Sequence, residues 1–229
     1  ALQSLRSAAE AGAAVIHLCD TNGGVLPNRL AEVIDRVRTV VSTPLGIHVH
    51  NDSDLAVANS LMAIEHGVVQ VQGTINGYGE RCGNANLCSI IAGLQVKMGI
   101  KVVTDEQLAR LTTVSANIAE LVNMSPNASQ PYVGARAFTH KGGLHAAAVA
   151  KVERSYEHME PSVVGNRRRV LVSELAGRSN VIAASRDAGL VMPPEVARQV
   201  LEQVKNAEAS GFQYEGAEAS FELLAHRIK

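Results

Sequence analysis

This chain has few aromatic side chains and no excess of charge of either sign. Aromatic residues make up 3% of its 229 residues and tryptophan is absent, which argues against platforms on which nucleobases stack. Its 21 basic and 22 acidic residues nearly balance, and the formal net charge is -1. A balanced charge offers no electrostatic basis for binding nucleic acid or an anionic membrane. We therefore expect neither as a partner.

Cysteines at metal-binding spacing and long apolar runs are missing as well. Cys19, Cys82 and Cys88 form no C-x-x-C pair, and an odd number of cysteines fits a reducing cytoplasm better than a disulfide framework. Gln, Lys or Gly interrupts the longest apolar stretches, so the sequence contains no recognisable signal peptide or membrane span. With 46% hydrophobic residues the chain can still bury a core, and we expect a cytoplasmic protein.

The first hundred residues repeat one pattern three times: a short apolar strand, a polar loop and a helix. Strands are expected at 14–19, 45–50 and 68–74, and helices at 2–11, 27–41, 55–66 and 87–97. In the helices apolar residues recur at helical spacing, and Pro27 suits a first helical turn. Units repeating at intervals of about thirty residues predict βαβ connections and a parallel sheet.

The pattern becomes mostly helical from residue 102 onward. Thr104 can cap a helix whose apolar stripe continues to Val122, and a loop-rich stretch follows it. Further helices are expected at 180–188, 195–209 and 217–227. We divide the chain into three βα units at 1–101, a helical linker subdomain at 102–155 and a second helical subdomain at 156–229.

Three parallel strands do not form a stable sheet by themselves. Both faces of a parallel sheet need cover, and an open edge pairs with other strands. A closed barrel of eight such units needs about 250 residues. The chain also begins within a helix that has no start signal. We therefore expect it to be part of a longer protein, or to receive its missing strands from elsewhere.

The strand at 45–50 ends in His48-Val49-His50-Asn51-Asp52. Side chains two residues apart share one face of a strand, so the two imidazoles are expected side by side, as the first ligands of a divalent metal would be. The alternative is a pair of surface histidines. Polar clusters at 20–24 and 76–86 follow the neighbouring strands, at the end where parallel α/β proteins place their chemistry. This coincidence favours a metal site.

The one run of basic residues is Arg167-Arg168-Arg169. We interpret it as a solvated loop or the start of a helix. Binding of a phosphate group is the alternative.

Four ordered motifs carry a resemblance to a known family. They are Asp20-Thr21-Asn22-Gly23-Gly24, His48-Val49-His50-Asn51-Asp52, Gly79-Glu80-Arg81-Cys82-Gly83-Asn84 and Phe138-Thr139-His140-Lys141-Gly142-Gly143-Leu144-His145. The chain resembles the 2-isopropylmalate, homocitrate and citramalate synthase family of metallolyase TIM barrels, and within it the longer type of citramalate synthase. The resemblance implies an α/β fold, with the last three βα units of a TIM barrel, incomplete in this chain, followed by a mostly helical subdomain.

The resemblance also implies an activity. Family members condense acetyl-CoA with a 2-oxo acid in a metal-assisted Claisen reaction and then hydrolyse the thioester, in branched-chain amino-acid biosynthesis. For citramalate synthase the oxo acid is pyruvate. A divalent Mg, Mn or Zn ion can polarise the ketone as a Lewis acid. The resemblance further implies a homodimer.

Site residues follow by their match to the family's motifs. His48 and His50 match two metal ligands, and Asn84 matches an asparagine at or near the metal, unless it only shapes its loop. Thr21 matches a threonine that binds the oxo-acid carboxylate, with a plain helix cap as the alternative. Glu80 matches a group that orients or activates the thioester region, with an ion pair to the neighbouring arginine as the alternative.

Two further matches lie in the helical region. His145 and Tyr156 match a histidine and a tyrosine that assist enolisation of acetyl-CoA and, in the family, reach the barrel of a neighbouring subunit. The family's acidic metal ligand, its catalytic arginine, a catalytic glutamate and its regulatory domain are not matched in this sequence. We therefore expect the isolated chain to be inactive.

Three other functions stay open. The first is 2-isopropylmalate synthase, which uses 2-oxoisovalerate. The second is a hydroxyacyl-CoA lyase on the same barrel, although the helical region with His145 and Tyr156 favours a synthase. The third is a non-catalytic interaction module.

Overall fold

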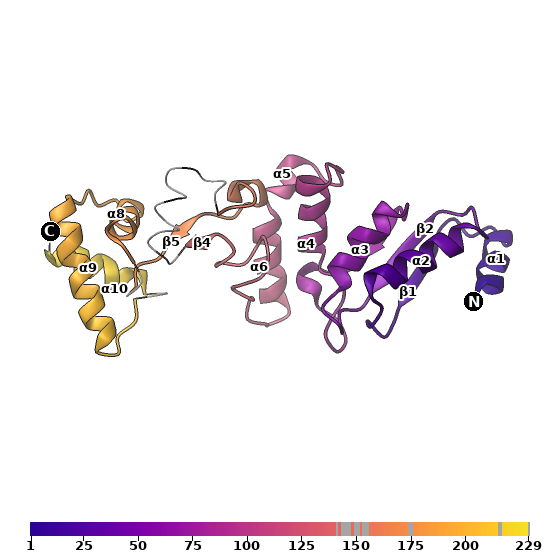
Figure 1. Ribbon diagram of the computed structural model, residues 1–229, viewed down its shortest axis with the longest axis horizontal. Coiled ribbons are helices and arrows are strands. Elements are labelled where there is room, and N and C mark those ends of the chain that lie inside the picture. The colour runs from indigo at the N-terminus through magenta and orange to yellow at the C-terminus, as the bar shows by residue number, and fades with distance from the viewer. Residues whose placement is uncertain are drawn as a thin grey trace. The chain divides into compact units, whose positions relative to one another are not determined.

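The computed structural model describes residues 1–140, 142, 148, 152, 156–173, 176–214 and 217–228 (Figure 1). The chain folds into two compact units. The first comprises Ala1–Pro126 with Pro131–Val133, and the second Asn127–Gln130 with Gly134–Lys229. Each unit has its own hydrophobic core. The sequence predicted three regions instead, divided at residues 102 and 156, and that division stays a prediction.

Three short parallel strands form the sheet of the first unit. They are β1 (Ile16–Asp20), β2 (Leu45–Val49) and β3 (Gln70–Gln72), in the spatial order β1-β2-β3. Neighbouring parallel strands need a crossover connection, which α2 (Pro27–Arg38) and α3 (Ala56–Glu65) provide. The predicted run of βα units is confirmed, and β3 is shorter than the predicted strand.

The remaining helical segments of the first unit follow the predicted order. They are α1 (Leu2–Glu10), η1 (Ile75–Gly77), α4 (Leu87–Ala92), η2 (Gly93–Lys97), α5 (Asp105–Leu108) and α6 (Leu111–Leu121). Thr104 begins α5 through a capping box with Gln107. The single helix predicted after Thr104 is wrong, because α5 is one capped turn and α6 starts separately. Leu121 and Val122 lie exposed rather than on a buried stripe.

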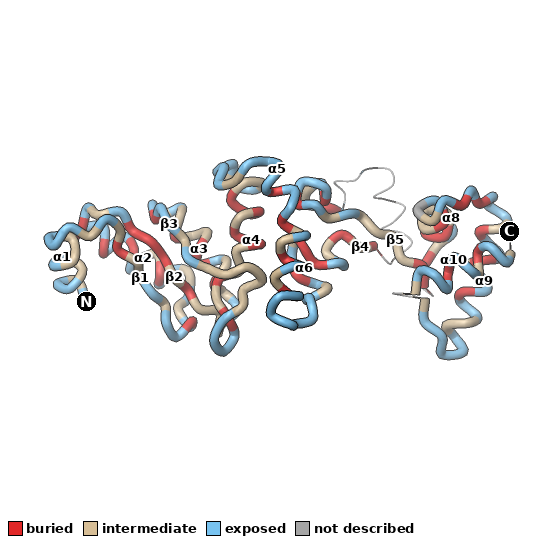
Figure 2. The backbone as a smooth tube through the Cα atoms, turned by 180° about the vertical axis from the view of Figure 1, so that it is seen from behind, coloured by how far each residue is buried: buried red, intermediate tan, exposed pale blue. Residues whose placement is uncertain are grey.

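The sheet has one apolar and one polar face, because side chains alternate along each strand. Ile16, Leu45, Ile47 and Val49 belong to the buried core, together with residues of α2 and α3. Figure 2 shows β2 as a buried strand within this unit. The other face carries polar residues in register, since Cys19 pairs with His48, and His48 with Gln72. The expected histidines therefore lie on the face away from the helix-packed core.

The second unit contains a two-stranded parallel sheet and a group of helices. Its elements are β4 (Thr139–His140), η4 (Pro161–Val164), β5 (Arg169–Val170), α8 (Arg178–Asp187), α9 (Pro194–Ala209) and α10 (Glu218–Ile228). Val181, Val200, Val204 and Phe221 are among the buried residues of their shared core. The three helices predicted here are confirmed to within about two residues, the usual uncertainty of helix ends. In the described part of both units, no helix is long and apolar enough to span a membrane.

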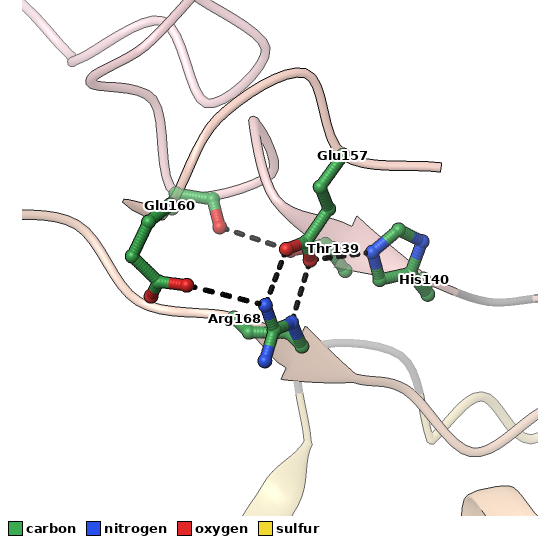
Figure 3. A network of polar contacts seen from close by, with 6 residues as sticks. Thr139, His140, Glu157, Glu160 and Arg168 are labelled. Atoms are coloured by element: carbon green, nitrogen blue, oxygen red, sulfur yellow. Dashed lines mark hydrogen bonds and ion pairs between the residues drawn. The ribbon is translucent and has the colours of Figure 1, made fainter. Parts of the chain in front are cut away.

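A buried carboxylate joins β4 and β5 to the segment between them (Figure 3). Glu157, with 3% of its side chain exposed, accepts hydrogen bonds from Arg168 through both carboxylate oxygens. His140 Nε2 lies 2.9 Å from Glu157 Oε1. Arg168 also lies 3.7 Å from Glu160. The interpretation of residues 167–169 as a solvated loop is confirmed for the exposed Arg167. It is wrong for the other two residues, because Glu157 draws Arg168 inward and Arg169 begins β5.

Two opposing effects act on the Glu157 carboxyl. Burial by itself would raise its pKa, but the hydrogen bonds and charges of Arg168 and His140 outweigh burial, and the pKa is lowered. A carboxyl whose pKa is lower in the folded than in the unfolded chain stabilises the fold above its unfolded pKa. That stabilisation is lost as the pH falls through the folded pKa.

We therefore expect Glu157→Gln to lower the free energy of unfolding by about 2 kcal/mol at pH 7, because it leaves a partly buried arginine without its main partner. The difference from the parent chain should be smaller at pH 3 than at pH 7, because pH 3 lies below the usual pKa of an unfolded glutamate, about 4.3, and the stabilisation that comes from a lowered pKa declines from there. Guanidinium unfolding followed by circular dichroism measures both. Glu160→Gln is the matched control, because Glu160 is exposed and should change little at either pH. A Glu157→Gln effect of equal size at both pH values would contradict the argument.

Candidate active site at the strand ends

The candidate site is built where the three parallel strands of the first unit end. His50 follows β2 and forms an isolated bridge with Asn84, from the loop after β3. The His50 N–H donates to the Asp20 carbonyl at the end of β1, 3.2 Å away. Backbone contacts thus bring together loops that are far apart in the sequence.

The two histidines lie side by side, as the alternation along the strand predicts. Their ring centres are 5.3 Å apart and the ring planes make an angle of 70°. Two imidazoles on one tetrahedral ion, with metal–nitrogen distances of about 2.1 Å, would have ring centres about 5 Å apart. The spacing of His48 and His50 therefore fits a shared metal ion.

Three buried polar atoms of the site have no hydrogen-bond partner among the described residues. They are Nδ1 of His48, Nδ1 of His50 and Oδ1 of Asn84. Buried polar atoms are almost always satisfied by protein, water or a bound group, so three such atoms at one site indicate a place for a ligand. In the described part of the chain, no group of three or more His, Cys, Asp or Glu side chains could hold a metal ion. A bound metal would therefore have to use the Asn84 amide oxygen or ligands from elsewhere.

The amide group of Asn84 is held in one orientation. Its Nδ2 donates to the Tyr78 carbonyl at 3.2 Å, and its Oδ1 accepts from no donor among the described residues. Gly79 allows this contact, because a Cβ at that position would lie 2.0 Å from Asn84 Nδ2. The loop after β3 therefore presents an oxygen, the atom that a hard divalent cation prefers.

A second contact anchors the same loop to α6. Asn76 adopts a left-handed backbone conformation with φ 64°. Its side chain accepts from the Ser115 hydroxyl at 2.5 Å and donates to the Ser115 carbonyl at 2.9 Å. The loop that carries Asn84 is therefore supported from the side of α6 as well as from β2.

Thr21 is exposed directly after β1 and lines a hollow of about 570 Å³. The other lining residues are Cys19, Asp20, Asn22 and Arg81. The Asp20 carboxylate already has a nearby partner, because it accepts a hydrogen bond from the Val25 N–H. Thr21 does not cap the following helix, since α2 starts at Pro27 without a side-chain cap. Its hydroxyl is therefore available to a small polar molecule in the hollow.

Arg81 and Asp52 form an ion pair that sequence reasoning missed. Arg81 Nε and Nη2 donate to the two carboxylate oxygens of Asp52, at 2.7 and 3.0 Å. Hydrogen bonding to Arg81 lowers the pKa of Asp52, and the same contact raises the pKa of Arg81. Glu80, considered as the partner of Arg81, lies 3.9 Å away and is 82% exposed. Arg81 and Asp52 are 29 positions apart, so no local pattern could reveal the pair.

The two candidate residues of the helical region are placed differently. Tyr156 belongs to the second unit and is about half exposed. His145 lies outside the described residues. The structure therefore describes the surroundings of only one of the two.

The sequence matches two protein-family models. The model of the HMGL-like family matches residues 1–118, which include all the loops described above. The chain belongs to the HMGL-like family. A second model, described as homocitrate synthase post-HMGL domain-like, matches residues 132–211. The α/β fold with βα units followed by a mostly helical region is thus the fold of an HMGL-like chain with a post-HMGL domain.

The similar proteins include members of the 2-isopropylmalate, homocitrate and citramalate synthase family. This HMGL-like chain is 53% identical over 229 residues to an (R)-citramalate synthase from Geobacter sulfurreducens, covering 99% of this chain and 43% of that protein. It is 48% identical over 234 residues to an (R)-citramalate synthase from Synechocystis, covering 98% and 43%. A solved HMG-CoA lyase from Bacillus subtilis is 22% identical with a TM-score of 0.48, over 55% of this chain and 45% of that chain. The chain therefore spans less than half the length of these two curated relatives.

We expect Gly23→Ala to destabilise the HMGL-like unit through its contact with the loop after β2. Gly23 has φ +66°, and a Cβ there would lie 2.4 Å from Asp52 Oδ2 and 2.8 Å from the Asp52 backbone nitrogen. The loss should be about 3 kcal/mol in the free energy of unfolding, from the left-handed backbone and the displaced loop together.

Gly99→Ala is the matched control for Gly23→Ala. Gly99 has φ +69°, but a Cβ at that position would have nothing within 4 Å, so only the backbone cost of about 1 kcal/mol should appear. Urea unfolding of both variants measures the difference. Equal losses would show that the close approach of Gly23 to Asp52 contributes nothing.

Proposed function

We propose that the whole protein is an acyltransferase that condenses acetyl-CoA with pyruvate to give citramalate, in branched-chain amino-acid biosynthesis. The observation that carries the proposal is the convergence of His48, His50 and Asn84, each with a buried atom that has no partner among the described residues, beside a hollow lined by Thr21. Relatives named (R)-citramalate synthase, at 46–53% identity over nearly the whole chain, support pyruvate as the oxo acid.

In this proposal His48, His50 and Asn84 hold a divalent cation, which is Mg, Mn or Zn. When bound, the cation supplies Lewis acidity that polarises the ketone of the 2-oxo acid. The imidazoles approach from one strand and the amide oxygen from the neighbouring loop. Because the Tyr78 carbonyl already holds the Asn84 amide, the site needs little rearrangement to present its oxygen.

Thr21 and Glu80 act on the substrates at the same edge of the sheet. Thr21 donates its hydroxyl to the carboxylate of the oxo acid, which the exposed position beside the hollow allows. Glu80 is exposed and its carboxylate lies 3.9 Å from Arg81, so that carboxylate can orient a group near the thioester.

His145 and Tyr156 assist removal of a proton from the acetyl methyl group and donation of a proton to the new alkoxide. Tyr156 precedes the buried Glu157, which fixes the backbone on one side of it. We propose that both residues serve the barrel of a neighbouring subunit in a homodimer. This arrangement favours the synthase over a lyase on the same barrel.

The metal proposal is tested by titrating the 229-residue chain with Co²⁺ and following its visible absorption. We expect weak binding by the parent chain and at least about tenfold weaker binding by His48→Ala and by His50→Ala, because each loses one nitrogen ligand. His66→Ala is the control, since its ring lies 2.9 Å from Asp35 at the far end of α3 from the site. Equal affinities of all four proteins would rule out the ligand assignment.

The reaction is tested in the whole protein by following CoA release from acetyl-CoA with pyruvate or with 2-oxoisovalerate. We expect turnover with pyruvate, and a loss of roughly 100-fold or more in kcat/KM for Tyr156→Phe, which removes a proton donor. The 229-residue chain alone should release no CoA, because it lacks a match to the family's acidic ligand. Turnover only with 2-oxoisovalerate, or only cleavage of a hydroxyacyl-CoA, would support one of the other two enzyme assignments. Absence of both reactions would support an interaction module.

A further inference from the structure

We infer that Arg81 is a positioning residue that joins the loops after β1, β2 and β3 and so holds the proposed metal ligands in place. The inference rests on the proposed function, since it assigns a role toward the ligands named there. It concerns a guanidinium that is not itself a ligand.

One guanidinium contacts two loops while it is carried by the third. Arg81 belongs to the loop after β3, three residues before Asn84. Its Nε and Nη2 donate to Asp52, two residues after His50, at 2.7 and 3.0 Å. Nη2 also donates to the carbonyl of Thr21, at 2.7 Å. Each loop that carries a proposed site residue of the first unit is therefore tied to Arg81.

Backbone hydrogen bonds close the same three loops onto one another. The Ser53 N–H donates to the Gly23 carbonyl at 3.0 Å, and the Asn51 N–H donates to the Gly83 carbonyl at 2.9 Å. Asn51 and Ser53 lie on either side of Asp52, the ion-pair partner of Arg81, in the sequence. If Arg81 holds the loops together, the protection of these two amides from exchange should depend on it.

The backbone of Arg81 itself is in an uncommon conformation. Its φ is 55°, in the left-handed region that non-glycine residues rarely adopt. Such a conformation persists where surrounding contacts determine it, and it occurs preferentially at functional sites. Here the contacts are those to Asp52 and Thr21. The planar fork of an arginine can make both at once, which the single ammonium of a lysine cannot do in the same geometry.

Stability alone is a weak reason for this arrangement. The Arg81 side chain is 40% exposed, and exposed ion pairs contribute little to the free energy of folding. A residue that positions metal ligands without contacting the ion, by contrast, typically changes metal affinity by about 10- to 100-fold when it is replaced. The two roles are therefore separable by measurement.

The first measurement is amide hydrogen exchange of the metal-free 229-residue chain. In Arg81→Gln we expect the amides of Asn51 and Ser53 to exchange about tenfold faster, because local opening of the loops becomes easier. Arg81→Lys should keep part of the protection, since it keeps the charge opposite Asp52 but not the contact to Thr21. Arg38→Gln is the matched control: Arg38 donates to the His66 carbonyl at 2.6 Å, at the far end of α2 from the loops.

The second measurement is the Co²⁺ titration described above, which a purely structural role would leave unchanged. We expect Arg81→Gln to bind Co²⁺ about tenfold or more weakly with an altered visible spectrum, while its thermal midpoint stays close to that of Arg38→Gln. Arg81→Lys should fall between Arg81→Gln and the parent chain. Faster exchange together with weaker binding supports the inference.

Four results would overturn it. Unchanged exchange in Arg81→Gln would show that the loops do not depend on Arg81, whether or not metal binds. Faster exchange with unchanged Co²⁺ affinity would show that Arg81 holds loops but not ligands. Arg81→Lys indistinguishable from the parent would show that charge suffices and the three-way contact does not matter. If the parent chain binds no Co²⁺ while Arg81→Gln exchanges faster, the proposed metal site fails, and the positioning role toward it fails with it, but the contact between loops stands.

Discussion

The alternation of side chains along three parallel strands is the constraint on which the rest of the first unit depends. It sends Ile16, Ile47 and Val49 toward α2 and α3, where they form the core. It sends His48 to the opposite face, in register with Cys19 and Gln72. Parallel pairing then places the three following loops at one edge. A packed core and a polar site thus arise from the same short strands without competing for the same residues.

The polar edge is held by contacts between loops rather than by any single loop. Gly23 approaches Asp52 too closely for any larger residue, and Arg81 spans the gap from the third loop to the other two. Asn84 is oriented by a carbonyl of its own loop. The buried atoms without a described partner remain at the centre of this arrangement, where a bound group would meet them. Side chains held in place around such atoms are the usual arrangement of a preorganised site.

In the second unit, buried charged side chains hold two short strands together. Two-residue strands offer little hydrogen bonding, and Glu157 joins them through Arg168 and His140. The arrangement depends on pH because a carboxylate is its centre. Tyr156 stands next to Glu157 in the sequence and is about half exposed.

Much of the secondary structure and part of the site were predictable from local sequence. Apolar residues recurring along one face located α2 and α9 closely, and Pro27 marked the first turn of α2. The adjacency of His48 and His50 followed from the same kind of rule, since it involves only neighbours on one strand. The continuous helix expected after Thr104 failed, because apolar spacing alone does not show that a single capped turn ends there.

The sequence by itself determined the order of strands and helices, the face on which the two histidines lie, and membership of the HMGL-like family. Only the tertiary structure decided that Arg81 pairs with Asp52 rather than mainly with Glu80, and that Arg168 turns inward to Glu157. The physical reason is the distance along the sequence over which each effect acts. Backbone periodicity acts between residues a few positions apart, whereas the partner of a charged side chain depends on which distant loops the folded chain brings within about 3 Å.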